Sequence, residues 1–289
     1  MLLSILIPTH DYNAYPLVQS LHQQAEALSV PYEMILVEDG SHDSVSMIAN
    51  LKTQDLSRCR YIRRKENVGR SAIRNFLMDE SKGDWLLFMD ADGKVVRKDF
   101  LQKYVDAARQ YDVVCGGVVH PDEWHDPERM LRWKYEKAYE RQHGTISEQF
   151  RSFSFLISRS VAQKVRFDER YKGYGYEDVQ FGKDLMAAGF MVHGIDNPLM
   201  NNDIEDNATF LRKTEEALWV AHHFKEDIGD LVKMNRLSTR YRLFSPLIRV
   251  LYRLSAPLLR RNLLSGNPNL LLFGFYKLGY YSSIRDKEI

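Results

Sequence analysis

The fold of this chain is decided by the stretch Trp85-Leu86-Leu87-Phe88-Met89-Asp90-Ala91-Asp92-Gly93, in which five apolar residues run into two aspartates one residue apart. An uninterrupted apolar run of this length predicts a strand that is buried on both faces of a parallel sheet. The aspartates then follow the carboxyl end of the strand, where open α/β sheets bind their ligands. Side chains alternate along an extended chain, so Asp90 and Asp92 point to the same side. Two such carboxylates can hold Mg²⁺ or Mn²⁺ against the phosphates of a nucleotide; the alternative is an ordinary Asp-Gly turn after a strand.

Composition and charge narrow the class of protein. The 289 residues are 44% hydrophobic and 27% charged, which is typical of a globular protein, and the net charge of +1 argues against a nucleic-acid binder. Cys59 and Cys115 lie in or beside apolar segments and predict buried free thiols in a reducing compartment. The apolar N-terminus predicts a first buried strand rather than a signal peptide, and no apolar run is long enough for a membrane-spanning helix. We therefore expect a cytoplasmic location.

Strands alternate with helical patterns along the first part of the chain. Apolar runs at residues 2–7, 32–37, 60–62 and 85–89 are separated by segments with helical spacing of apolar residues. This alternation predicts βαβ units and a mostly parallel sheet flanked by helices, the α/β class. In the helix after the second strand, Asp43 or Ser44 is expected to be the N-cap. The same helix is expected to turn Val45, Ile48 and Leu51 inward.

Polar loops follow the other strands as well. Pro8-Thr9-His10-Asp11 follows the first strand, and Glu38-Asp39-Gly40-Ser41 follows the second. The segment from Asn67 to Asn75 opens a helix, where Gly69 lets backbone approach a ligand and the helix N-terminus favours an anion. Arg70 and Arg74 are four residues apart and share a helix face. The alternative is a loop-to-helix junction that carries two solvated arginines.

A second informative stretch is Gly173-Tyr174-Gly175-Tyr176-Glu177-Asp178, where a loop rich in Gly and Tyr meets a helix that starts with two acids. Acids in a first helical turn are also ordinary dipole and capping residues, and this alternative stays open. The aromatic residues between 121 and 150 suit a helix or lid beside a polar ligand, or core packing.

The C-terminal part is helical and basic. Residues 207–231 have a helical pattern, and residues 236–264 contain seven arginines and no acid among apolar and aromatic residues. A basic amphipathic segment suits the surface of an anionic membrane. The alternative is a helical pair that packs on the rest of the protein.

Taken together, these motifs resemble those of the family 2 glycosyltransferases, which have the GT-A fold. Five elements carry the resemblance in order over residues 2 to about 215: residues 5–13, Val37-Glu38-Asp39-Gly40-Ser41, Asn67-Val68-Gly69 with Arg74-Asn75, Asp90-Ala91-Asp92, and Gly173 to Asp178. The resemblance implies a GT-A, Rossmann-like catalytic domain at 1–205 and a helical C-terminal extension at 206–289. Two departures are Glu38, where the family has Asp, and Asn201, where relatives often have a His that binds metal or diphosphate.

The resemblance also implies a mechanism, namely inversion at the anomeric carbon by a single displacement. Asp178 would be the general base, with Glu177 orienting the acceptor or the base. Asp92 would be the main metal ligand, and Asp90 would contact the ribose or the metal through water. Other nucleotide-sugar contacts would come from the strand-end loops and the helix that starts near residue 70: Pro8, Thr9, Asp11, Glu38, Asp39 for the base, Asn67, Gly69, and Arg74 for the phosphates.

Substrates and cofactor follow from the same resemblance. The cofactor would be Mn²⁺ or Mg²⁺, and the donor a nucleotide-diphosphate sugar, with a UDP-sugar expected. The acceptor would be a saccharide, free or lipid-linked, in surface polysaccharide or glycan synthesis. The basic segment 236–264 would place the protein at the inner face of the cell membrane.

Three competing hypotheses remain. A haloacid-dehalogenase-type phosphatase also uses an Asp-x-Asp, but normally at its first strand, whereas here three βα units precede the pair. A nucleotidyltransferase typically has a Gly-rich loop after strand one, and residues 8–13 contain no glycine. A non-catalytic nucleotide-sugar-binding or scaffold protein of the same fold is the third, kept open by Asn201 and opposed by Asp92 and Asp178.

Overall fold

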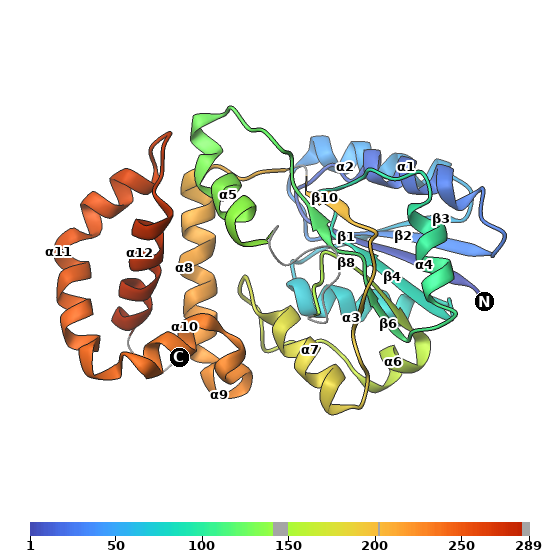
Figure 1. The fold of residues 1–289 in the computed structure, drawn as a ribbon. Coiled ribbons are helices and arrows are strands. Elements are labelled where there is room, and N and C mark those ends of the chain that lie inside the picture. The colour runs from blue at the N-terminus through green and yellow to red at the C-terminus, as the bar shows by residue number, and fades with distance from the viewer. Residues whose placement is uncertain (141–149, 202, 285–289) are drawn as a thin grey trace. The chain divides into compact units, whose positions relative to one another are not determined.

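The computed structural model describes residues 1–140, 150–201 and 203–284 (Figure 1). Contacts group the chain into two compact units: unit 1 is Met1–Pro121, His143–Lys172 and Phe181–Asp203, and unit 2 is Asp122–Gln142, Gly173–Gln180 and Ile204–Ile289. Each unit is described by itself below. The division into domains at residue 205 stays a prediction. Part of the aromatic segment predicted as a helix or lid, residues 141–149, lies outside the described residues.

Unit 1 contains a mixed sheet that is mostly parallel. Among the described residues its strand order is β3-β2-β1-β4-β8-β6-β9. Parallel pairing joins β1 to β2 and β4, β2 to β3, and β6 to β9, while β8 runs antiparallel to β4 and β6. The strands are β1 (Leu3–Thr9), β2 (Tyr32–Asp39), β3 (Cys59–Arg64), β4 (Trp85–Met89), β6 (Val113–Cys115), β8 (Ser154–Ser158) and β9 (His193–Gly194). The predicted α/β class is therefore confirmed, and the apolar run at 85–89 is a central strand.

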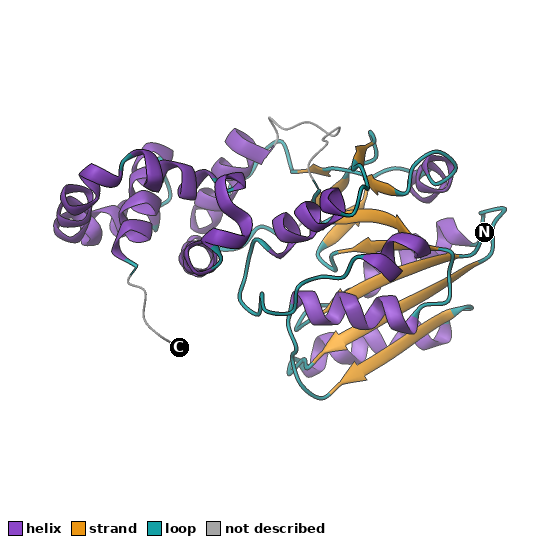
Figure 2. Cartoon of the chain, turned by 90° about the horizontal axis from the view of Figure 1, so that it is seen from below, coloured by secondary structure: helices purple, strands orange, loops and turns teal. Residues whose placement is uncertain are grey.

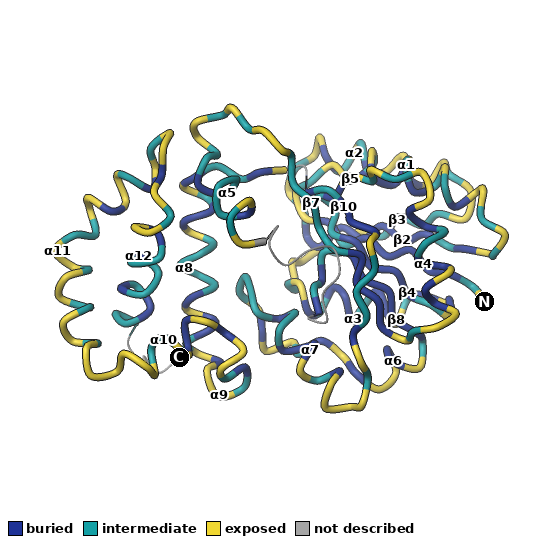
Figure 3. The backbone as a smooth tube through the Cα atoms, viewed as in Figure 1, coloured by how far each residue is buried: buried dark blue, intermediate teal, exposed yellow. Residues whose placement is uncertain are grey.

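Helices cover both faces of this sheet (Figure 2). Side chains alternate along β1, so that Leu3, Ile5 and Ile7 lie in one hydrophobic core and Leu6 lies in the other. The helices α1 (Tyr15–Ala25) and α4 (Phe100–Ala107) contribute to the first core. The second core receives α3 (Arg70–Glu80), α6 (Arg159–Lys164) and α7 (Glu177–Ala187), and the strands between the two cores are buried (Figure 3).

A small three-stranded sheet follows the aspartate pair. It consists of β5 (Gly93–Val95), β10 (Leu199–Asn201) and β7 (Val118–Val119), with β10 in the middle. The antiparallel pairing of β10 with β5 places Asn201 opposite Gly93. Residues near 201 are thereby brought to the segment that carries Asp92.

The expectation for α2 (Ser44–Leu51) was wrong in one respect. Asp43 is its N-cap, as predicted, but Val45 and Ile48 are 75% and 66% exposed and Leu51 is 48% exposed. The buried residues of this helix are Ser46 and Asn50. Asn50 accepts hydrogen bonds from the backbone of Ala14 and Tyr15 and donates one to Glu38, so a polar anchor holds the helix where an apolar face was expected.

Unit 2 is helical. Its elements include α5 (Met130–Tyr135), a π-helical turn (Glu136–Glu140), α8 (Asn207–His223), α9 (Lys225–Ile228), α10 (Lys233–Arg240), α11 (Ser245–Leu263) and α12 (Leu270–Ser283). The core of this unit joins Leu131 of α5, Phe210 of α8, Leu259 and Leu263 of α11 and Phe273 of α12. The predicted C-terminal helices are therefore present. In the part of the chain that the structure describes, none of the helices is both long and apolar enough to cross a membrane.

Candidate nucleotide-sugar site

Asp39 ties two of the predicted motifs together at the carboxyl end of β2. The residue is 4% exposed, and its side chain accepts hydrogen bonds from the backbone N–H groups of Val68 and Gly69, each at 3.1 Å. Burial raises the pKa of Asp39, and the two backbone hydrogen bonds oppose this rise. The Asn67-Val68-Gly69 loop is thus fastened to the second strand, as the order of motifs at one sheet edge predicts.

Gly40 makes this close approach possible. It has a φ of +65°, and a Cβ built on it would lie 2.2 Å from the backbone nitrogen of Asn67. A residue with a side chain would therefore be strained by its backbone conformation and would also push the loop away.

We expect Gly40→Ala to lower the free energy of unfolding by about 2–4 kcal/mol, because strain and a backbone clash add. Urea unfolding of the purified variant measures this. The matched control is Gly189→Ala, since Gly189 has a φ of +84° but nothing within 4 Å of its built Cβ. Equal losses in the two variants would show that the contact with Asn67 has no energetic role.

Glu38 is engaged inside unit 1. The residue is 1% exposed, and its carboxylate accepts hydrogen bonds from Ser41, from Asn50 at 2.6 Å and from Tyr61 at 3.2 Å. A glutamate reaches these three partners at once, which gives a physical reason for Glu at this position. Its contact with a nucleotide stays a prediction.

Asp11 connects the first two strand-end loops. It has a φ of +49°, and its Oδ1 accepts hydrogen bonds from the backbone N–H groups of His42 and Asp43 at 2.5 Å and 2.8 Å. These bonds, that from Asp43 first, lower the pKa of Asp11. Thr9 is buried and donates to the backbone of Tyr12, and Pro8 is half-buried. The loop therefore holds a defined shape at the sheet edge.

Arg74 is ion-paired with Asp90, the first member of the aspartate pair. It is 2% exposed, and its Nη2 lies 2.8 Å from Oδ1 of Asp90 and 3.3 Å from Oγ of Ser152. Arg70, one turn earlier in α3, has a 44% exposed side chain and a guanidinium 4.0 Å from Asp90. The alternative of two solvated arginines is therefore wrong for Arg74, which is part of the charged centre.

The carboxyl group of Asp92 has a raised pKa in this centre. Burial first, and then the Asp90 carboxylate and Asp203, raise its pKa to about 6, against the opposing charge of Arg70. A raised carboxylate pKa means that negative charge here is poorly compensated. The cluster therefore favours a cation.

Sequence reasoning missed Asp203. It lies close enough to interact electrostatically with both Asp92 and Tyr12. The signal that could have found it is its place two residues after Asn201, because the β10–β5 pairing carries this segment back to the aspartates. Asn201 itself is 6% exposed.

The donor set fits Mg²⁺ or Mn²⁺ bound together with a diphosphate. Among the described residues, no three His, Cys, Asp or Glu side chains form a complete metal cage. Such ions commonly take only one or two protein carboxylates, and phosphate oxygens and water complete the coordination. Asp92 and Asp90 are the residues that would hold the ion.

Glu177 and Asp178 belong to unit 2, whereas the aspartate pair belongs to unit 1. Glu177 is 3% exposed, and Oδ1 of Asp178 accepts a hydrogen bond of 2.8 Å from the backbone of Val179. The preceding loop is anchored on α8, because the backbone N–H of Tyr174 donates to Glu216 at 2.8 Å.

Tyr176, two residues before Asp178, has a φ of +66°. Burial raises its pKa, as do Tyr135, Asp178 and Tyr281 around it. A bulky residue held in the left-handed region is a feature typical of functional sites. The general-base role of Asp178 stays a prediction.

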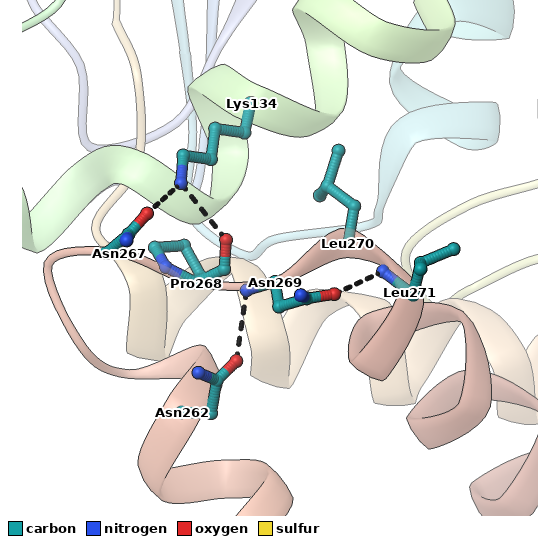
Figure 4. A pocket seen from close by; sticks show the side chains of 7 residues that line it. All are labelled: Lys134, Asn262, Asn267, Pro268, Asn269, Leu270 and Leu271. Atoms are coloured by element: carbon teal, nitrogen blue, oxygen red, sulfur yellow. Dashed lines mark hydrogen bonds between the residues drawn. The ribbon is translucent and has the colours of Figure 1, made fainter.

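One surface pocket lies elsewhere in unit 2. It has a volume of about 480 Å³ and is lined by Lys134, Asn262 and residues 267–271 (Figure 4). Its polar groups bond to one another, since Lys134 donates to Asn267 and to the carbonyl of Pro268 at 3.2 Å. None of the sequence-predicted site residues lines this pocket.

The family model for Glycosyl transferase family 2 matches residues 4–166, more than half of the chain. The uncharacterized glycosyltransferase YfnE of Bacillus subtilis is 28% identical over 188 residues, which cover 63% of this chain and 43% of that protein. The chain spans about half the length of the curated relatives that it matches.

Two solved structures share the fold. TarS 1-349 of S. aureus in complex with UDP-GlcNAc is 16% identical, with a TM-score of 0.54 over 97% of this chain and 90% of that chain. The mannosyltransferase PcManGT of Pyrobaculum calidifontis, in complex with GDP-Man and Mn2+, is 16% identical, with a TM-score of 0.52 over 75% of this chain and 61% of that chain. These likenesses confirm the predicted GT-A fold.

Proposed function

The chain belongs to glycosyl transferase family 2, and from this premise we propose that it moves a sugar from a nucleotide-diphosphate sugar to a hydroxyl group of a saccharide acceptor. The observation that carries the proposal is the centre in unit 1, where Asp90, Asp92 and the buried Arg74 meet at the end of β4. Beside it, Asp39 fastens the loop at 67–69. The haloacid-dehalogenase hypothesis finds no support here, because the acid pair follows the fourth strand in the chain and the family model begins at residue 4.

We propose a UDP-sugar as the donor and Mn²⁺ or Mg²⁺ as the cofactor. Support comes from the poorly compensated charge at Asp92 and from the complexes of the two neighbours, one with UDP-GlcNAc and the other with GDP-Man and Mn2+. When bound, the ion would supply charge neutralisation to the departing diphosphate. Asp92 and Asp90 would hold it, and Arg74 would keep the Asp90 carboxylate in place through its ion pair.

We further propose inversion by a single displacement. Asp178 would accept the proton of the acceptor hydroxyl as that oxygen attacks the anomeric carbon. Glu177 would orient the acceptor or Asp178. Burial of Glu177 and the backbone hydrogen bond to Asp178 give both side chains restricted positions, which supports such roles.

The acceptor we propose is a saccharide of a surface polysaccharide or a lipid-linked glycan. The basic segment 236–264 supports this, because it would attract an anionic membrane from the cytoplasmic side. A peripheral location at the inner face of the cell membrane follows.

A thermal-shift panel with UDP, GDP, CMP and dTDP, each with and without Mn²⁺, tests the donor proposal. A ligand at 100 times its dissociation constant stabilises a fold by roughly 2.7 kcal/mol, which is readily measured. We expect a shift with UDP that requires the ion. A shift with none of the four, in a sample that melts cooperatively, would contradict both the UDP-sugar donor and the non-catalytic nucleotide-sugar-binding hypothesis.

We expect Asp203→Asn to weaken Mn²⁺ binding in the presence of UDP by about threefold to tenfold, because one negative charge beside Asp92 is removed. Titration calorimetry measures this. Asp196→Asn, which changes an exposed aspartate in the same unit, is the control and should bind as the parent does. Identical affinities for the parent and Asp203→Asn would remove Asp203 from the metal centre.

A further inference from the structure

The C-terminal helices of unit 2 are strongly and uniformly basic. Between residues 231 and 284 there is no Asp or Glu, and there are nine Lys and Arg residues. Because the whole chain has a net charge of +1, the remaining residues carry −8. A separation of charge on this scale predicts attraction to an anionic surface and repulsion of the rest of the chain from it.

One face of α11 is apolar and exposed. Together with Leu243, which lies in the 3₁₀ turn Arg242–Phe244 just before α11, we call it the apolar stripe. The exposed fractions are 92%, 56%, 53%, 48%, 76% and 70% for Leu243, Leu247, Val250, Leu251, Leu254 and Leu258. Within α11 the members are spaced by three, one, three and four residues, which places them on one side of a helix. Figure 3 shows exposed positions recurring along α11. A continuous exposed apolar face of this kind marks an interaction site.

The opposite face of the same helix is buried. Leu259 and Leu263 pack into the core of unit 2 with Phe273 and Tyr276 of α12. The helix is therefore held in place by one face, and the stripe is left on the other. The packing interpretation of segment 236–264 therefore holds for one face of this helix, and the membrane interpretation stays a prediction for the other.

A row of arginines runs beside the stripe. Arg249, Arg253 and Arg260 of α11 are spaced by four and seven residues and share a face, and Arg242 lies in the 3₁₀ turn Arg242–Phe244 just before this helix. Val250 and Leu254 each follow one of the arginines of α11, so the stripe lies about 100° further round the helix. Arg242 and Arg253 are exposed, whereas Arg249 donates to the carbonyl of Ser282 and Arg260 pairs with Glu215.

We propose that α11 lies in the plane of an anionic bilayer, with the apolar stripe among the acyl chains and the arginine row at the lipid phosphates. The inference rests on the proposed function, which places segment 236–264 at a membrane. It adds which face of one helix makes the contact. Charge complementarity favours lipid over a second copy of the chain, because pairing two stripes would bring together two helical segments that are basic and contain no Asp or Glu. Amphipathic helices with basic flanks bind membranes in this manner.

Co-sedimentation of the full chain with vesicles tests the proposal. We expect binding to vesicles with 30% anionic phosphatidylglycerol in phosphatidylcholine, and weak binding to phosphatidylcholine alone. The variant Leu254→Gln should lower the partition coefficient about tenfold, and Leu254→Gln with Leu258→Gln further. Arg242→Gln with Arg253→Gln should weaken binding to anionic vesicles and reduce its dependence on salt.

The matched control is Ile48→Gln on α2, which removes an apolar side chain of similar exposure from unit 1 and should leave partition unchanged. Melting curves establish that each variant folds, and the thermal shift with UDP and Mn²⁺ reports on the donor site separately. Donor binding without vesicle binding would overturn the inference alone, and vesicle binding without donor binding would overturn the proposed function alone. Equal partition of the parent and the stripe variants would also overturn the inference. The inference would also be overturned if the parent is a dimer in solution and Leu254→Gln converts it to a monomer without loss of vesicle binding.

Discussion

Replacing Asp92 by Asn is expected to abolish sugar transfer and at the same time to stabilise the protein in the absence of metal. Transfer should fall about 10³-fold in kcat/KM, because several kcal/mol of charge stabilisation by the ion are lost. Stability should change in the other direction, because burial and the neighbouring carboxylates of Asp90 and Asp203 raise the pKa of Asp92 from 3.8 to about 6. The unfolded chain ionises first as the pH rises, so the charged Asp92 destabilises the folded state progressively between about pH 4 and pH 6.

At pH 8 and without metal, Asp92→Asn should therefore raise the free energy of unfolding by up to about 3 kcal/mol, and at pH 3 by almost nothing. Urea unfolding at both pH values, in the presence of a chelator, measures the difference. The control is Asp196→Asn, which removes an exposed aspartate of the same unit and should show no such pH dependence. A variant that keeps full transfer activity would exclude Asp92 as the metal ligand. If Asp92→Asn is less stable than the parent at pH 8, the negative charge of Asp92 is not poorly compensated in the folded protein.

Asp178→Asn is expected to lower kcat by about 10² to 10⁴-fold while leaving the affinity for UDP and Mn²⁺ unchanged, because the variant cannot accept the hydroxyl proton. Steady-state kinetics with calorimetry of UDP binding separate the two effects. Asp184→Asn, two turns later in the same helix, is the matched control and should transfer sugar at the parental rate. Unchanged kcat in Asp178→Asn would remove Asp178 as the base. Equal losses of kcat and UDP affinity would assign it a structural role.

The fold was predictable because its determinants are local. The apolar run at 85–89, the polar residues after each strand and the alternation with helices all specify a mostly parallel sheet, and the structure confirms it. The antiparallel β8 within that sheet was not predicted, since the direction in which a strand enters a sheet depends on the whole path of the chain. The family itself was predicted correctly from five motifs in order.

The prediction for α2 was wrong because a polar contact, and not its apolar residues, decides which face of this helix packs on the protein. Val45 and Ile48 have the spacing of a buried face, yet Asn50 anchors α2 through its amide, and the apolar residues face solvent. The spacing of apolar residues reports only where hydrophobic side chains recur. It does not reveal a single buried amide whose hydrogen bonds are all made inside the protein. For the same reason the burial of Arg74 against Asp90 was not predicted.

The candidate site was predictable as a set of motifs and only partly as a set of contacts. The link from Asp39 to Gly69 follows from the meeting of strand ends at one edge. Asp203 was missed because its approach to Asp92 depends on the long-range pairing of β10 with β5. The loop at 173–180 groups with the helical unit through contacts with α8, which no local pattern encodes.

We propose that this chain cleaves the bond between a sugar and a nucleoside diphosphate at the centre built on Asp90 and Asp92. Release of UDP from a panel of UDP-sugars, measured with Mn²⁺ or chelator for the parent and for Asp92→Asn, is the decisive experiment. We expect slow release even without acceptor for at least one donor, dependent on the ion and absent in the variant. Release that persists unchanged in chelator and in Asp92→Asn would exclude this centre as the site of cleavage, and so would no release from any donor in the presence of a saccharide acceptor mixture.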